Sequence, residues 1–199
     1  MCKTIAVFGL LAILSLSAAA QKNEVAIVAG AKYTPSGTSP TGQTNVSSAF
    51  AFEVSYATQL VSAKVADLEL EVPLLAIPTS QINSTNLFTA KSYSSLYLMP
   101  GLRGRLATDS ALSPWAAAGF GLVRFGPSSS NLAGGPSAST ASTKSAFNLG
   151  GGVDLRPAKA PVAFRGEIRW LYTGVPSLAV PHLSMHNNVL VGGGIVLRF

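Results

Sequence analysis

The last twelve residues of the chain alternate in polarity, and this pattern constrains the fold more than any other segment. One parity of residues 188–199 is aliphatic and ends on an aromatic ring: Val189, Val191, Ile195, Leu197 and Phe199. The small or polar residues Asn188, Gly192, Gly194 and Arg198 fall on the other parity. Because successive side chains of a β-strand point to opposite faces, the segment predicts a strand with one apolar face. Such a face suits contact with lipid, and the alternative is an edge strand of a soluble sheet.

The first twenty residues have the layout of a secretory signal peptide. Lys3 supplies a basic start, residues 5–16 form an apolar run, and three alanines at 18–20 offer a cleavage site. The run is shorter than the roughly 20 residues of a membrane-spanning helix. Cleavage after Ala20 would remove Cys2, the single cysteine, and exclude disulfides and thiol catalysis. The sequence therefore predicts a signal peptide at 1–20 and one domain at 21–199.

The composition indicates a membrane protein rather than a soluble domain. Charged residues make up 11% of the chain, against about 25% in ordinary soluble domains. Hydrophobic residues make up 48%, yet after residue 20 they are dispersed in alternation, as in a membrane barrel. A net charge of +6 could indicate nucleic-acid binding, but the basic residues are not clustered. We therefore expect contact with outer-membrane lipid and no nucleic-acid partner.

Alternation bounded by turn residues predicts eight strands, at about 24–33, 48–58, 64–74, 95–107, 115–125, 145–156, 162–172 and 188–199. Each is close to the 9–11 residues with which a tilted strand crosses a bilayer. The predicted fold is all-β: an eight-stranded antiparallel up-and-down transmembrane β-barrel. Pro73 and Pro100 predict bulges or strand ends, because proline donates no hydrogen bond to the ladder.

The links between these strands alternate in length. Long links at 34–47, 76–94, 126–144 and 174–185 alternate with short ones at 59–63, 108–114 and 157–161. Outer-membrane barrels have long extracellular loops and short periplasmic turns. An even number of strands would then place both chain ends on the periplasmic side. Among the aromatic residues, Trp115 and Phe199 are expected at the periplasmic interface, and Tyr33, Trp170 and Tyr172 at the outer one.

On four of the predicted strands, at 64–74, 95–107, 145–156 and 162–172, charged residues alternate with apolar ones. An arginine or lysine facing lipid costs roughly 2–4 kcal/mol at the bilayer midplane, so the charged parity must face the lumen. The predicted lumen network is Glu53, Asp67, Glu69, Glu71, Arg103, Arg105, Asp154, Arg156, Arg165, Glu167, Arg169 and Arg198, and Glu24 and Lys32 also face inward. Since buried charges need partners, we expect an ion-paired lumen, with a narrow porin-like channel as the alternative.

A soluble lipocalin-like barrel is the competing fold, because it also has eight antiparallel strands and a signal peptide. Its polarity would be reversed, with an apolar cavity and a charged exterior. Alternation alone does not separate the two folds, since either face could point inward. The low overall charge and the terminal Phe199 favour the membrane barrel, because so few charges would solvate a soluble exterior poorly.

Three segments carry a resemblance to a known family: Phe147-Asn-Leu-Gly-Gly-Gly-Val-Asp154, Phe164-Arg-Gly-Glu-Ile-Arg-Trp170 and Gly192-Gly-Gly-Ile-Val-Leu-Arg-Phe199. With the strand pattern, they resemble the small eight-stranded bacterial outer-membrane β-barrel domains, the family of the OmpA barrel and OmpX. The resemblance covers essentially all of the chain after residue 20. It implies an outer-membrane location and a C-terminal assembly signal, at Ile195, Leu197 and Phe199, that the barrel-assembly machinery reads. It implies no particular activity.

One enzymatic alternative rests on His182 and Ser184, which resemble the His-x-Ser pair of PagL-like lipid A deacylases. Those enzymes continue the pair with Asn, where this chain has Met185, and no Asp or Glu follows Glu167. A hydrolase needs a nucleophile, a base and an orienting acid, so this alternative is the least favoured. His182 and His186 are also a thin ligand set for a metal. We therefore expect a monomeric, non-enzymatic protein of envelope structure or surface interaction, without catalytic, cofactor-binding or metal residues.

Overall fold

The computed structural model describes residues 23–34, 37–39, 42–46, 48–84, 87–106, 110–126, 129–130, 141–157, 160–174 and 187–199. The predicted signal peptide lies outside these residues. Within them the chain forms one antiparallel sheet, and no helix there is long and apolar enough to cross a membrane.

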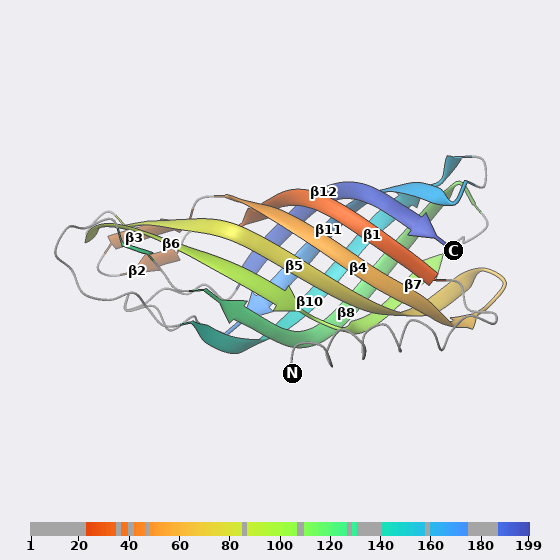
Figure 1. Ribbon diagram of the computed structural model, residues 1–199, viewed down its shortest axis with the longest axis horizontal. Coiled ribbons are helices and arrows are strands. Elements are labelled where there is room, and N and C mark those ends of the chain that lie inside the picture. Colours follow the sequence, from red (N-terminus) through yellow and green to blue (C-terminus); the bar gives the residue numbers. More distant parts are fainter. Residues whose placement is uncertain are drawn as a thin grey trace, which may run out of the picture.

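The strands are β1 (Asn23–Tyr33), β2 (Gly37–Ser39), β3 (Gly42–Val46), β4 (Ala49–Ser62), β5 (Ala66–Ser84), β6 (Leu87–Leu98), β7 (Gly101–Leu106), β8 (Leu112–Phe125), β9 (Ser129–Ser130), β10 (Ser142–Leu155), β11 (Val162–Thr173) and β12 (Asn187–Arg198). Figure 1 shows them wound around a common axis. The prediction of an all-β fold is confirmed.

The sheet closes on itself through its first and last long strands. Glu24 of β1 lies opposite Arg198 of β12 on one side and Ala57 of β4 on the other. The ring then runs β4, β5, β6 with β7, β8, β10, β11 and β12. β6 and β7 follow each other along the chain, and both pair with β5 on one side and with β8 on the other. Counted as one interrupted strand, they make the described residues the predicted eight-stranded barrel.

The two prolines with strand-like positions lie one residue out of register with each other on neighbouring strands. The break between β6 and β7 falls at Met99 and Pro100, as predicted. β5 instead continues through Pro73, where a strand end was an alternative, and Pro73 lies where the partner of β5 changes from β7 to β6. The backbone N–H of Met99 donates to the carbonyl oxygen of Pro73 at a donor–acceptor distance of 3.4 Å. Two residues that donate no ladder hydrogen bond thus share one interruption.

The predicted link at 76–94 is wrong, and those at 34–47 and 126–144 contain the short strands β2, β3 and β9. Residues 76–94 were expected to form a loop, but β5 extends to Ser84 and β6 begins at Leu87. The register of β5 shifts between Ile77 and Ser80, so the pairing resumes after a bulge. β3 pairs with the far part of β5, and β9 pairs with β6. Ser, Thr and Asn were read as loop residues, yet Thr is also common in strands, and pairing on both sides holds this segment extended.

The two ends of the barrel differ in the length of their links. The links between β4 and β5, β7 and β8, and β10 and β11 are short, and they lie at the end where β1 begins and β12 ends. We call this the short-link end. At the opposite, long-link end, β2, β3 and the extensions of β5 and β6 project beyond the other strands (Figure 1). The predicted alternation holds for the long links between β1 and β4, β8 and β10, and β11 and β12, but not between β5 and β6, which only residues 85–86 separate.

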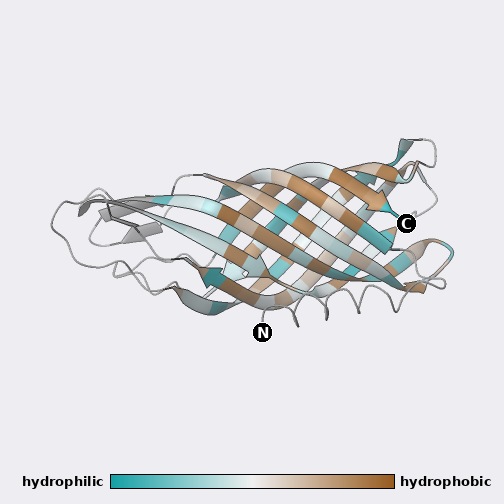
Figure 2. Cartoon of the chain, in the orientation of Figure 1, coloured by the Kyte–Doolittle hydropathy of each residue, from teal (hydrophilic) through white to brown (hydrophobic). Residues whose placement is uncertain are grey.

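The outer surface of the barrel is an apolar belt. Figure 2 shows hydrophobic residues along the strands of the barrel wall. Large side chains on every long strand point outward, including Phe120, which is 65% exposed, and Ile168, which is 54% exposed. The other parity of the same strands is buried, as the alternating pattern of β11 shows. This is the arrangement of a barrel in lipid, with the apolar parity outside.

Replacing Ile168 by arginine should lower the free energy of unfolding by about 2–4 kcal/mol in lipid. Ile168 lies midway along β11 and points outward, so the charge would sit near the bilayer midplane. The unfolding midpoint in denaturant, followed by the gel shift of folded protein in lipid vesicles, measures the effect. Ile168→Ala serves as the control for lost apolar area. Equal stability of the arginine and alanine variants would contradict the lipid-facing assignment.

Candidate functional site

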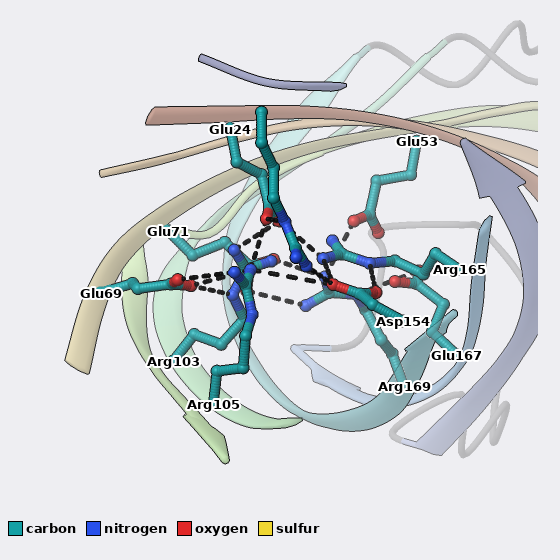
Figure 3. A network of polar contacts seen from close by, with 11 residues as sticks. Glu24, Glu53, Glu69, Glu71, Arg103, Arg105, Asp154, Arg165, Glu167 and Arg169 are labelled. Carbon is teal, nitrogen blue, oxygen red and sulfur yellow. Dashed lines mark hydrogen bonds and ion pairs between the residues drawn. The ribbon is translucent and has the colours of Figure 1, made fainter. Parts of the chain in front are cut away.

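Charged side chains from seven strands converge in the part of the lumen nearer the short-link end (Figure 3). Their inward direction follows from strand parity, because each lies on the buried face of its strand. The charge network, as we define it, is Glu24, Glu53, Glu69, Glu71, Arg103, Arg105, Asp154, Arg165, Glu167, Arg169 and Arg198. All but Arg198 are at most 5% exposed.

Glu24 is the centre of one half of this network. Its Oε1 accepts from Nη2 of Arg103 at 2.5 Å and from Nη2 of Arg165 at 2.6 Å. Its Oε2 accepts from Nε of Arg198 at 3.1 Å and also from Arg105. Four guanidinium groups from three strands thus meet one carboxylate of β1. Such charge-assisted hydrogen bonds are the stronger kind, and here they join opposite sides of the barrel.

Two further carboxylates complete the pairing of these arginines. Asp154 binds Arg165 in a two-point contact, with Nε–Oδ1 at 2.8 Å and Nη2–Oδ2 at 2.9 Å. It also accepts from Nη2 of Arg198 at 2.6 Å. Glu69 accepts from Nε of Arg103 at 2.6 Å and lies 3.1 Å from Nη1 of Arg105. The planar guanidinium groups are suited to such two-point contacts.

Arg169 holds the other half of the network. Its Nη2 lies 2.9 Å from carboxylate oxygens of both Glu53 and Glu71, and its Nε lies 3.3 Å from Glu167. Glu71 links the two halves, because it also contacts Nη1 of Arg103 at 3.3 Å. The pairing with Glu53 is by proximity alone, since neither of its oxygens has an aligned hydrogen bond within the described part of the chain.

Trp115 lies inside the network, and its predicted place at the membrane interface is wrong. Its side chain is 5% exposed and faces the lumen. The guanidinium carbons of Arg165, Arg169 and Arg103 lie 4.9, 5.3 and 5.6 Å from its ring centroid. At these distances the ring attracts the cations. Trp115 shares the buried parity of Ser113 and Ala117, and no charged neighbour on that part of β8 marks this parity in the sequence.

Two residues of the predicted network lie at its rim. Asp67 is buried at 5% exposure and accepts a hydrogen bond from the hydroxyl of Ser62 at 2.7 Å. Arg156 follows the last residue of β10, and its backbone N–H donates to the carbonyl oxygen of Ala111 at 2.7 Å. The other predicted members all take part in the ion pairs described above.

A second, apolar layer lies in the lumen nearer the long-link end. Its members are Ala49, Ala51, Leu75, Ile77, Tyr93, Tyr97, Met99, Val123, Phe125, Ala146, Leu171 and Leu190. We call them the apolar layer. Lys32 lies beside it at 1% exposure, with Nζ 3.0 Å from Oγ of Ser80 and 3.4 Å from the hydroxyl of Tyr93. The sequence places Lys32 in the lumen but does not predict this layer, because the strands carry apolar residues on both faces at this level.

The closing strand has the faces that its alternation predicts. Ile195, Leu197 and Phe199 point outward at 53%, 48% and 65% exposure. The backbones of Phe199 and Asn23 exchange two hydrogen bonds, at 2.8 and 3.0 Å, at the seam between the ends of the sheet. The candidate residues of the deacylase alternative, His182 and Ser184, and the neighbouring His186 lie outside the described residues.

Comparisons with known proteins agree with the fold. Neisserial surface protein A has 20% identity and a TM-score of 0.58, with 90% of this chain and 99% of that protein covered. OprG, an outer membrane protein of Pseudomonas aeruginosa, has 13% identity and a TM-score of 0.55, covering 90% and 96%. Ail of Yersinia pestis, an attachment invasion locus protein, has 11% identity and a TM-score of 0.51, covering 90% and 97%. At identities this low, structural likeness establishes the fold alone.

No curated protein matches the chain in sequence. A family model does: the outer membrane protein beta-barrel domain matches residues 6–193, nearly the whole chain. The closed barrel, its apolar belt and the resemblance of the strands agree with this match. The chain therefore belongs to the outer membrane protein β-barrel domain family and is a protein of the bacterial outer membrane.

Proposed function

We propose that this protein is a closed, non-enzymatic outer-membrane barrel that acts in envelope structure or surface interaction. The observation that carries the proposal is the two sets of buried side chains that point into the lumen. The charge network occupies one part of it and the apolar layer occupies the other. An eight-stranded barrel has an interior just wide enough for side chains to fill, and this one has large side chains in both layers.

Each layer opposes the passage of ions in its own way. An ion crossing the charge network would have to displace buried pairs such as Arg165 with Asp154, which are held by two aligned hydrogen bonds. An ion crossing the apolar layer would lose its hydration shell between Tyr97, Met99 and Leu171, which are at most 1% exposed. Apolar constrictions of this kind exclude water and close channels.

The filled lumen also supports a non-enzymatic function. The carboxylates of the charge network are engaged by arginines, whereas a catalytic acid or base must reach a substrate proton. The apolar layer separates the network from the long-link end. A substrate entering from that end would not reach these groups.

The surface for interaction, in this proposal, is the sheet at the long-link end. β2, β3, β5, β6 and β9 pair there in that order, beyond the other strands (Figure 1). Short turns of outer-membrane barrels face the periplasm, so this sheet faces outward from the cell. We also propose that the barrel-assembly machinery reads the C-terminal strand through Ile195, Leu197 and Phe199, and that the barrel is a monomer surrounded by lipid.

Planar-bilayer recording tests the closed lumen. Protein purified from outer membranes, with its folded state confirmed by the gel shift on boiling, should give no stable unitary conductance in 1 M KCl. The same protein unfolded by boiling before addition is the control for nonspecific leakage. Large, stable, reproducible steps from the folded sample alone would refute the closed lumen and favour the narrow channel.

A further inference from the structure

Arg124 is the one charged residue on the outward face of the barrel strands whose side chains the structure describes. The other strand arginines, at 103, 105, 165, 169 and 198, point into the lumen. On β8 the outward parity is otherwise apolar and includes Phe120 and Leu122, which are 65% and 57% exposed. An arginine facing hydrocarbon is costly, so its position along the strand decides its role.

Arg124 lies where the apolar belt ends. Leu122 precedes it on the outward face of β8, and Leu96 lies opposite it on β6; they are 57% and 45% exposed. One outward position further toward the long-link end, β6 carries Ser94 in place of a leucine. On β10 the opposite residue is Thr143. The guanidinium therefore lies at the boundary between hydrocarbon and headgroups, the depth of lipid phosphates.

A hollow adjoins Arg124 at this boundary. It has a volume of about 270 Å³ and is lined chiefly by Ala76, Pro78, Ser94, Leu96, Arg124 and Gly126. Two features of the backbone shape it. A bulge in β5 between Ile77 and Ser80 displaces Pro78, and Gly126 lacks a side chain, whose Cβ would lie 2.2 Å from Oγ of Ser94. The hollow thus has an apolar part near the belt and a polar part with one cation.

We propose that Arg124 and this hollow bind a phosphorylated lipid of the outer leaflet. The guanidinium would hold the phosphate, with the hydroxyl of Ser94 beside it, and an acyl chain would lie on Ala76 and Leu96. Arginine suits phosphate because its planar fork donates two parallel hydrogen bonds. A single cation at a lipid-exposed position would hold free phosphate weakly, and the apolar part of the hollow favours a lipid.

Lipid adducts of the purified full chain test this proposal. Protein in a neutral maltoside detergent is titrated with dioleoyl phosphatidic acid, and adducts are counted by native mass spectrometry. Wild type should retain one phosphatidic acid, and Arg124→Gln should weaken its binding about tenfold, the effect of one charge-assisted contact. Arg124→Lys should bind between the two. Lys64→Gln, which removes an exposed cation at the short-link end, should bind as wild type does.

Three further experiments distinguish binding of the lipid from binding of other anions and from a general effect of charge. Ala76→Trp should fill the hollow and weaken binding while Arg124 is retained. Dioleoylglycerol, which lacks the phosphate, should not bind, and millimolar inorganic phosphate should not displace phosphatidic acid. Every variant must first show the gel shift of a folded barrel. Equal binding by wild type and Arg124→Gln, binding of dioleoylglycerol, or displacement by inorganic phosphate would each overturn the proposal.

Discussion

Replacing Arg103 by methionine should lower the free energy of unfolding of the barrel by about 3–5 kcal/mol, the cost of removing one partner of a buried ion pair. Arg103 is 0% exposed and contacts Glu24, Glu69 and Glu71. Methionine has a similar length and fills much of the space, so the loss comes from the three carboxylates left in the lumen. Denaturant unfolding in lipid vesicles, followed by the gel shift, measures it.

The matched control is Arg124→Met, the same substitution at an outward position with no ion pair among the described residues. It should change the free energy of unfolding by less than about 1 kcal/mol. Adding Glu69→Gln to Arg103→Met should cost less than the sum of the single changes, because the two side chains share a hydrogen bond. Equal effects of the two methionine variants would show that the charge network does not stabilise the fold.

Replacing Gly194 by valine should destabilise the barrel by about 3 kcal/mol or more, at the upper end of the cost of overpacking. A Cβ at Gly194 would lie 2.0 Å from the carbonyl oxygen of Ile27 and 2.7 Å from Cα of Val28. Both atoms belong to the backbone of β1, so the clash cannot be relieved by turning a side chain. The seam between β1 and β12 must then separate locally, and the fraction of folded, gel-shifting protein should fall.

The adjacent Gly193 provides the control on the same strand. It points outward, and the nearest atom to an added Cβ is the carbonyl oxygen of Arg165 at 3.6 Å. Gly193→Val should therefore fold with a stability within about 1 kcal/mol of wild type. If both variants lose folded protein equally, the effect reflects the β12 sequence in general rather than the close approach of two strands.

Alternation in the sequence was sufficient to assign the two faces of most strands. Charges mark the inward parity on β5, β7, β10 and β11, and the structure buries Glu69, Arg103, Asp154 and Arg165. The reason is geometric, because a strand has a period of two and charges that alternate along it fix the direction of their neighbours. The single Arg124 of β8 is no such guide, because it points outward. Where no charge marks the parity, as around Trp115 on β8, the direction could not be assigned and the prediction was wrong.

The partners across the lumen could not be predicted in the same way. Glu24 and Arg165 are 141 positions apart and meet because the tilt and stagger of the strands bring β1 and β11 to one level. Local alternation carries no information on that stagger. The extension of β5 and β6 was missed for a related reason: the polar residues between 78 and 92 resemble a loop until their pairing partners are known.

Thiol accessibility inside the barrel tests the closed lumen most directly. In a Cys2→Ser background, Ala26→Cys and Ala51→Cys place thiols in the lumen at positions that are 0% and 1% exposed. A charged, water-soluble maleimide should label neither thiol in the folded barrel and both after boiling. Labelling of the folded protein at both positions, at the rate of the boiled sample, would show a water-filled lumen and contradict the account.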